Sequence, residues 1–221
     1  MTFSKALAGV VSIAFLTACT HLNAADASTS TEAATEAAQS DVDLSDAPSG
    51  SYKADQGHRY ITFFYDHQGF SEPFVRWRSW DADLDWNAED PEKSSVSVVI
   101  DATSIDTGVD VFDGHLRGER FFNVETHPTI TFDSTELVRT GPATGKMTGD
   151  LSIKGITKPV TLDVTFKKAA FNQRANGAKI GFSARGSLLR SEFDLGLAVP
   201  IVGDEVSIII EVEFDEEKAA E

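Results

Sequence analysis

The sequence predicts an all-β fold built from antiparallel strands, and three observations lead to this prediction. Apolar and polar residues alternate over several stretches, turn-forming residues separate those stretches, and no amphipathic helix of ordinary length is found. Alternation with a period of two places the apolar side chains on one face of a strand. Short turns between such strands favour the hairpins of an antiparallel sheet over β-α-β units.

The clearest strands are four stretches that alternate along the chain: Ser95–Asp101, Val160–Phe166, Lys179–Ala184 and Val206–Phe214, the last interrupted only by Ile209. Turns are expected at Gly141-Pro142, Lys154-Gly155 and Asn176-Gly177, and an Asn-Gly pair is a strong hairpin signal.

One short helical insertion is expected near residues 107–118, with Val111, Phe112, His115 and Leu116 on one side. Closing the sheet into a barrel would remove its exposed edges, and about eight strands would enclose side chains or one ligand. Periodicity alone does not distinguish a barrel from a sandwich.

Residues 1–18 are expected to be a signal peptide. Lys5 supplies the positive charge, and Ala6–Ala18 is apolar or small but shorter than the roughly 20 residues of a membrane-spanning helix. The peptide ends in Leu-Thr-Ala followed by Cys19, the only cysteine of the chain, which predicts lipidation of Cys19. The alternative is ordinary cleavage near residues 22–24, which would discard Cys19.

The remaining chain divides by composition into three parts. Residues 19–49 are acidic and of low complexity, and such a segment cannot bury enough apolar surface to fold, which predicts a tether. Residues 50–214 form the folded domain, and 215–221 are expected to be an acidic tail. Thr20 is not acidic, which favours sorting to the outer membrane over inner-membrane retention.

Charge and motif content exclude several functions. The formal net charge of −16 argues against nucleic-acid binding. No motif of a hydrolase, zinc protease or nucleotide-binding enzyme occurs, and the five histidines lack metal-ligand spacing. The sequence therefore predicts no catalytic residues, no metal site and no cofactor.

Two segments of the chain carry recognisable motifs: Ser104–Phe132 and Gly149–Leu162 (GDLSIKGITKPVTL). The motif positions of the first segment are His115, Leu116, Arg117, Phe121, Phe122, Asn123, Val124, Pro128 and Thr129–Phe132. In this order and spacing the two segments resemble the YceI-like family of exported, lipocalin-like barrels that hold a long isoprenoid or similar lipid. The resemblance implies an extended lipocalin-like antiparallel barrel over residues 50–214.

Alternation assigns the inward side chains that would line a lipid cavity: Ile61, Phe63, Val98, Ile100, Ile130, Phe132, Leu162, Val164, Phe182, Ile208 and Ile210, with Val160 and Ile180 also inward. A filled interior and a lipid tunnel would both be apolar, so this set does not separate them. The resemblance favours the tunnel.

Residues 72–86 depart from the family pattern because they hold all three tryptophans and two arginines. A bulky strand pair would explain this composition. Alternatively, the segment forms a ligand entrance where Trp77 or Trp80 contacts the lipid and Arg76 meets an anionic headgroup. His58 is a further headgroup candidate, although a hydrogen-bonded structural role is favoured for it. Arg117 is expected to tie the helix to the barrel rim, and Phe121 and Phe122 to plug the barrel end.

The expected function is non-catalytic binding, storage or transport of a quinone or prenyl pyrophosphate type of lipid in the bacterial cell envelope. The protein would face the periplasm as an outer-membrane lipoprotein or be soluble there. The alternatives are a partner-binding stress lipoprotein with a filled barrel, or an enzyme acting on a bound lipid. The oligomeric state is left open.

Overall fold

The computed structural model describes residues 46–218, and the predicted signal peptide and the Cys19 lipidation site lie outside this range. Within it the chain forms ten strands, one α-helix and short 3₁₀ turns at Pro91–Lys93, Ala102–Ser104 and Arg190–Phe193. The strands are β1 (Gly50–Tyr65), β2 (Phe74–Trp77), β3 (Trp80–Trp86), β4 (Ser95–Asp101), β5 (Ile105–Asp106), β6 (Thr129–Arg139), β7 (Thr144–Ile153), β8 (Ile156–Asn172), β9 (Gly177–Leu189) and β10 (Glu205–Glu216). The helix is α1 (Asp110–Arg117).

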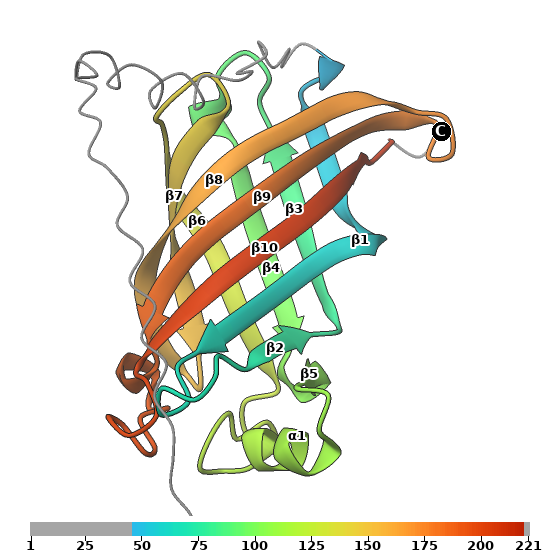
Figure 1. Cartoon of the computed structure of the whole chain (residues 1–221). Helices are drawn as coiled ribbons and strands as arrows, with labels where there is room; N and C mark the ends of the chain where they lie inside the picture. The colour runs from blue at the N-terminus through green and yellow to red at the C-terminus, as the bar shows by residue number, and fades with distance from the viewer. Residues whose placement is uncertain (1–45, 219–221) are drawn as a thin grey trace, which may run out of the picture. The chain divides into compact units, whose positions relative to one another are not determined.

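Eight of the strands that the structure describes close into an antiparallel barrel, which confirms the predicted fold class (Figure 1). Their order is β10-β9-β8-β7-β6-β4-β3-β1, and β1 pairs again with β10 to close the circle. The first part of β1 pairs with β3, and its last part pairs with the short strand β2. Strand β5 in turn pairs with β2 and extends the sheet. Residues 72–86 form two strands, β2 and β3, as expected, but these pair with different parts of β1 and not with each other.

A bulge in β1 decides which of its side chains face inward. The pairing with β10 jumps between Ala54 and Arg59, so four residues of β1 lie opposite Glu213 alone. Before the bulge the buried positions are Tyr52 and Ala54, and after it Ile61 is buried. Inward positions therefore change from even to odd numbers, because successive side chains of a strand point to opposite faces.

The predicted turns lie between strands, and the positive φ angles at Gly155 and Asn176 explain why glycine and asparagine occur there. Lys154 and Gly155 join β7 to β8 with φ of 51° and 75°. Asn176, with φ of 52°, ends the connection from β8 to β9. Asparagine and glycine adopt this left-handed conformation more readily than other residues.

The helix occupies most of the predicted insertion but presents a different buried face. Leu116 and Asp113 are buried, whereas Val111 is 71% exposed and His115 is exposed. The Asp113 carboxylate accepts hydrogen bonds from the backbone N–H and the hydroxyl of Thr107, at 2.8 and 2.6 Å. These bonds turn Asp113 inward, so the prediction that Val111 and His115 share the packed face was wrong.

Both ends of the predicted folded domain need correction. Ala47, assigned to the tether, is fully buried, and its carbonyl accepts a hydrogen bond from Trp86 Nε1 at 3.1 Å. Strand β10 continues to Glu216, so Asp215 and Glu216 belong to the barrel and not to a tail. Among residues 46–218, no helix is long and apolar enough to span a membrane.

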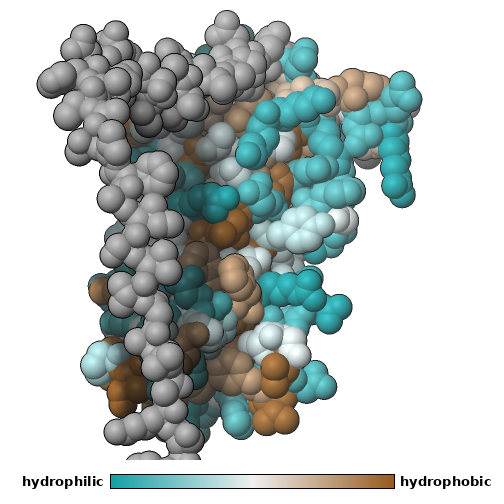
Figure 2. All heavy atoms as spheres, viewed as in Figure 1, coloured by the Kyte–Doolittle hydropathy of each residue, from teal (hydrophilic) through white to brown (hydrophobic). Residues whose placement is uncertain are grey.

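On the face of the molecule in Figure 2, hydrophilic side chains dominate the upper right, and hydrophobic ones gather lower down, towards α1. Inward side chains are apolar, since the buried residues of β3, β6 and β8 are nearly all aliphatic or aromatic.

Candidate functional site

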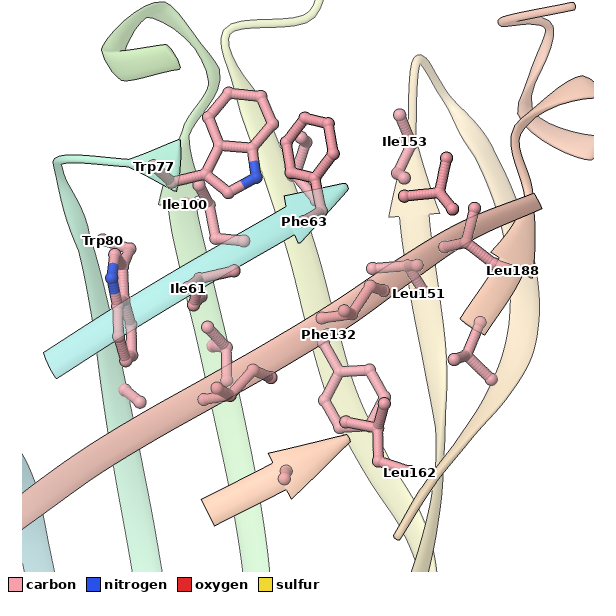
Figure 3. A pocket seen from close by; sticks show the side chains of 18 of the residues that line it. Ile61, Phe63, Trp77, Trp80, Ile100, Phe132, Leu151, Ile153, Leu162 and Leu188 are labelled. Carbon is pink, nitrogen blue, oxygen red and sulfur yellow. The ribbon is translucent and has the colours of Figure 1, made fainter. Parts of the chain in front are cut away.

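A cavity of about 370 Å³ runs through the barrel interior. Ligand pockets in proteins measure roughly 300–1,000 Å³ and are mostly apolar. The side chains in Figure 3 come from strands around the barrel and converge on this space: among them are Ile61, Phe63, Trp77, Trp80, Ile100, Phe132, Leu151, Ile153, Leu162 and Leu188. Such a lining suits an apolar guest, which binds by removal of apolar surface from water.

All eleven side chains assigned to the barrel lining from alternation lie around this cavity, as does Val160. Ile180 is fully buried but is not among the lining residues. It pairs with Phe214 of β10, which lines the cavity, and with Ala169 of β8, which does not. Contact between the eleven lining residues and a ligand stays a prediction.

Two glycines shape the wall by making room for lining side chains. A Cβ on Gly149 would lie 2.3 Å from Cζ of Phe132 and 2.6 Å from the Asp133 carbonyl oxygen. A Cβ on Gly186 would lie 2.6 Å from Cδ2 of Leu162. Phe132 and Leu162 can therefore occupy their positions in the wall only because their neighbours lack side chains.

One end of the cavity, called here the Trp86 end, is packed with aromatic rings. The Trp86 ring lies 6.0 Å from that of Phe166 and 5.9 Å from that of Phe182. Phe182 also makes edge contacts with Phe166 at 5.5 Å and with Phe214 at 6.1 Å. Rings at these separations attract one another beyond their area burial, so the cluster gives this end a rigid wall.

The opposite end, called here the α1 end, is formed by α1 and two connections, residues 66–73 and 190–204. Side chains from all three contribute to the lining, among them His67, Phe112, Leu116, Leu197 and Val202. The Trp77 ring meets Phe122 edge-on at 5.1 Å and Phe63 at 5.9 Å. Phe121 and Phe122 line the cavity here, at the barrel end where the sequence placed a plug.

Arg117 has the structural role expected of it. Its Nε donates to the Thr103 carbonyl at 2.8 Å, and one Nη donates to the Ile105 carbonyl at 3.0 Å. These bonds fasten α1 to the chain segment that follows β4.

The four candidate entrance residues separate into two groups. Trp77 and Trp80 line the cavity and are 7% and 4% exposed. His58 and Arg76 are not among the lining residues. Arg76 instead forms an ion pair with Asp106 across β2 and β5, with its Nη 2.7 Å from the carboxylate. Its side chain is 59% exposed, so it belongs to the outer surface.

His58 lies in the β1 bulge and has the hydrogen-bonded role that the sequence favoured. Its Nδ1 is 2.8 Å from the Asp55 carboxylate. Asp55, His58 and Glu213 bring potential metal-binding atoms within 4.8 Å of one another, which their sequence spacing did not reveal. The Lys179 ammonium already lies 2.5 Å from Asp55 and 2.9 Å from Glu213. The lysine therefore supplies a cation to these two carboxylates.

Partial burial alone would raise the pKa of Asp55. Hydrogen bonds from Lys179, the Gly57 amide and His58 outweigh it and hold that pKa well below its usual range. Burial alone would lower the pKa of Lys179, but its bonds to Asp55, Glu213 and Asp215 raise it above the usual value. Asp55 and Lys179 are thus both ionised near neutral pH.

Sequence reasoning missed several lining residues. Met147, Leu151 and Ile153 alternate along β7, and Ala82, Leu84 and Trp86 along β3, so the same period-two pattern would have found them. Leu195, Leu197 and Val202 lie in the connection between β9 and β10, where no periodicity marks them.

Comparison with known proteins agrees with this geometry. The YceI-like domain family matches residues 52–214. A UPF0312 protein of Ectopseudomonas mendocina is 32% identical over 156 residues, which cover 71% of this chain and 81% of that protein.

Two solved structures share the fold. Burkholderia cenocepacia BcnA superposes with a TM-score of 0.66 and 25% identity, covering 72% of this chain and 98% of BcnA. A polyisoprenoid-binding domain of Saccharophagus degradans superposes with a TM-score of 0.59 and 10% identity, covering 77% of this chain and all of that domain. With a matching family over nearly the whole barrel and the fold and cavity described above, the chain belongs to the YceI-like family.

Proposed function

We propose that this protein binds, stores or transports a long-chain isoprenoid or similar lipid, of the quinone or prenyl pyrophosphate type, without chemical turnover. The cavity carries the proposal, because an interior of about 370 Å³ lined almost wholly by apolar side chains is suited to a hydrocarbon chain. The binding of a polyisoprenoid by the structurally similar Saccharophagus domain supports it.

The cavity also bears on the alternatives. A barrel with a filled interior would leave no space of this volume, so the partner-binding alternative loses its structural basis. Among the lining residues within 46–218 there is no carboxylate and no lysine, and the ionisable side chains are those of Tyr65, His67 and Arg190 alone. An enzyme acting on a bound lipid would need a larger cluster of positioned acid and base groups there.

The proposed place of action is the bacterial cell envelope. Its support is the sequence of residues 1–19, with a short apolar stretch before the lone Cys19. A lipid anchor on Cys19 would hold the barrel at a membrane, facing the periplasm, and cleavage further along would release it as a soluble periplasmic protein.

The test is native mass spectrometry of the full chain purified from a bacterial host with a cell envelope, followed by organic extraction of any adduct. The expected result is a stoichiometric adduct that extracts as an isoprenoid. A mass without an adduct, unchanged after incubation with quinones and prenyl phosphates, would refute the proposal.

Three variants locate the bound lipid. Leu162→Asp places a charge in the cavity wall and should abolish the adduct, whereas Val99→Asp, on the outer face of β4 and 50% exposed, should keep it. Ala184→Phe fills the space with an apolar ring, so it should reduce binding without burying a charge. Full lipid retention in folded Leu162→Asp and Ala184→Phe proteins would place the lipid elsewhere.

A further inference from the structure

The cavity lining has few polar side chains. Within residues 46–218, the lining includes only three ionisable side chains, those of Tyr65, His67 and Arg190, all at the α1 end. Two serines, Ser94 and Ser95, are the polar lining residues near the Trp86 end. Any polar headgroup of a bound lipid must be matched by this small set.

Arg190 is the only permanent cation among these lining residues, and the backbone already occupies it. Its Nε donates to the Gly203 carbonyl at 2.8 Å, and its Nη atoms donate to the carbonyls of Leu195, Leu197 and Val202. These bonds use four of the five N–H donors of a guanidinium. The one donor left does not provide the paired N–H groups with which arginine clamps a phosphate.

The role of Arg190 is therefore to hold the connection between β9 and β10 in place. The side chain is buried, with the residue 9% exposed, and its four acceptors belong to residues 195–203. Asp204 lies close enough to offset part of its charge. A pyrophosphate at this end would meet no uncommitted cation in the lining.

Two other basic side chains near the α1 end, Arg76 and Lys154, are engaged outside the cavity. Arg76 pairs with Asp106 at 2.7 Å, and Lys154 pairs with Asp194 at 2.7 Å. Neither lines the cavity.

Tyr65 and His67 have polar groups available for a ligand. Tyr65 follows Ile61 and Phe63 on the inward side of β1, and His67 lies in the connection after β1, so both line the cavity towards the α1 end. Neither side chain makes a hydrogen bond to another residue within 46–218, and both residues are partly buried. Burial raises the pKa of Tyr65 despite the nearby Arg190, so its phenol keeps the proton that it would donate.

We propose that the lipid held in this barrel has an uncharged, oxygen-bearing headgroup, such as a quinone carbonyl or a prenyl alcohol hydroxyl, which lies at the α1 end and hydrogen-bonds Tyr65 and His67. A prenyl pyrophosphate is disfavoured, because inside the cavity its charge would meet no free cation among the lining residues. This inference rests on the proposed function and narrows its ligand class.

The first test compares two probes with the same tail, geranylgeraniol and geranylgeranyl pyrophosphate, added to the delipidated full chain. Binding is followed by tryptophan fluorescence, because Trp77, Trp80 and Trp86 all line the cavity, and by calorimetry. The alcohol should bind at least tenfold more tightly than the pyrophosphate. Equal or tighter binding of the pyrophosphate would overturn the inference while leaving lipid binding intact, and binding of neither probe would overturn the proposed function itself.

The second test removes single polar groups. Tyr65→Phe deletes only the hydroxyl and should weaken geranylgeraniol binding about two- to tenfold, the usual effect of one hydrogen bond. Tyr60→Phe is the matched control, because Tyr60 is 55% exposed and does not line the cavity. His67→Leu should likewise weaken binding.

Thermal melting of each variant separates a lost contact from a damaged fold. Unchanged affinity for geranylgeraniol in both folded variants would overturn the placement of the headgroup at the α1 end.

Discussion

Lys179 joins three strands through one ammonium group, and its replacement by methionine is the most direct test of what fixes the β1 bulge. Its Nζ lies 2.5 Å from Asp55 in the bulge of β1, and 2.9 and 3.2 Å from Glu213 and Asp215 of β10. Lys179→Met keeps the length of the side chain but leaves three neighbouring carboxylates without their shared cation.

The expected loss of unfolding free energy in Lys179→Met follows from the burial of the ionic cluster. Ion pairs at the surface contribute about 0–1 kcal/mol, and loss of one partner from a buried pair costs about 3–5 kcal/mol. The side chains of Lys179 and Asp55 are 17% and 20% exposed, and those of Asp215 and Glu213 are 31% and 42% exposed. The cluster lies between the two limits, so the free energy of unfolding should fall by about 2 kcal/mol.

The pKa shifts of Asp55 and Lys179 determine how the stabilisation by the cluster changes with pH. Asp55 has a folded pKa below its ordinary value. Its stabilisation is therefore complete above about pH 4, the ordinary carboxyl pKa, and is lost as the pH falls through the folded value. Lys179 has a raised pKa, so its contribution is complete below about pH 10 and is lost as the pH rises further. The difference between wild type and Lys179→Met should be constant from about pH 5 to pH 10 and shrink in acid.

The assay is urea unfolding followed by tryptophan fluorescence at several pH values. Lys146→Met is the control, because Lys146 and Asp163 also pair at 2.6 Å but their side chains are 55% and 70% exposed. It should cost less than about 0.5 kcal/mol. If both variants lose the same stability, or if the Lys179→Met difference persists unchanged at pH 2, the attribution to a partly buried ionic cluster is wrong.

Two further predictions concern close packing and a buried phenol. Gly149→Ala should destabilise the barrel by about 1–3 kcal/mol, because the added Cβ would lie 2.3 Å from the Phe132 ring. Gly50→Ala, which meets nothing within 4 Å, should have little effect in the same thermal melts; equal effects would contradict the packing explanation. Burial, helped by the charge of Glu216, raises the pKa of Tyr52 to about 12. Its contribution to stability is therefore complete below about pH 10 and is lost as the pH rises through 12. Ultraviolet titration should show an ionisation near pH 12 that Tyr52→Phe removes, and its persistence in that variant would refute the assignment.

Much of the fold could be predicted because alternation is a local property of the chain. Strand β4 has the predicted bounds, and the stretch Val160–Phe166 lies within β8 with the expected buried face. Every residue assigned to the cavity lining lies around the cavity for the same reason. Closure of the sheet into a barrel depends on the pairing of β1 with β10, which are far apart in sequence, so only the family resemblance indicated it.

The candidate headgroup residues show where local reasoning ends. The sequence favoured a hydrogen-bonded role for His58, and Asp55 supplies that bond. The sequence position of Arg76, by contrast, gave no sign that Asp106 would hold it outside the cavity. Tyr65 continues the alternation of Ile61 and Phe63 and could have been predicted to point inward, whereas His67 lies beyond the end of β1, where alternation gives no guidance. The role of Arg190 depends on carbonyl groups of a connection that has no periodicity.

The sequence by itself determined the strands, their turns and the apolar inner face, because these depend on residues close together in the chain. The tertiary structure alone decided that the interior holds a cavity, which polar groups line it and which cations are already bound. Those properties depend on contacts between strands far apart in sequence, such as β1 with β10, and on backbone groups that carry no signature in the amino-acid order.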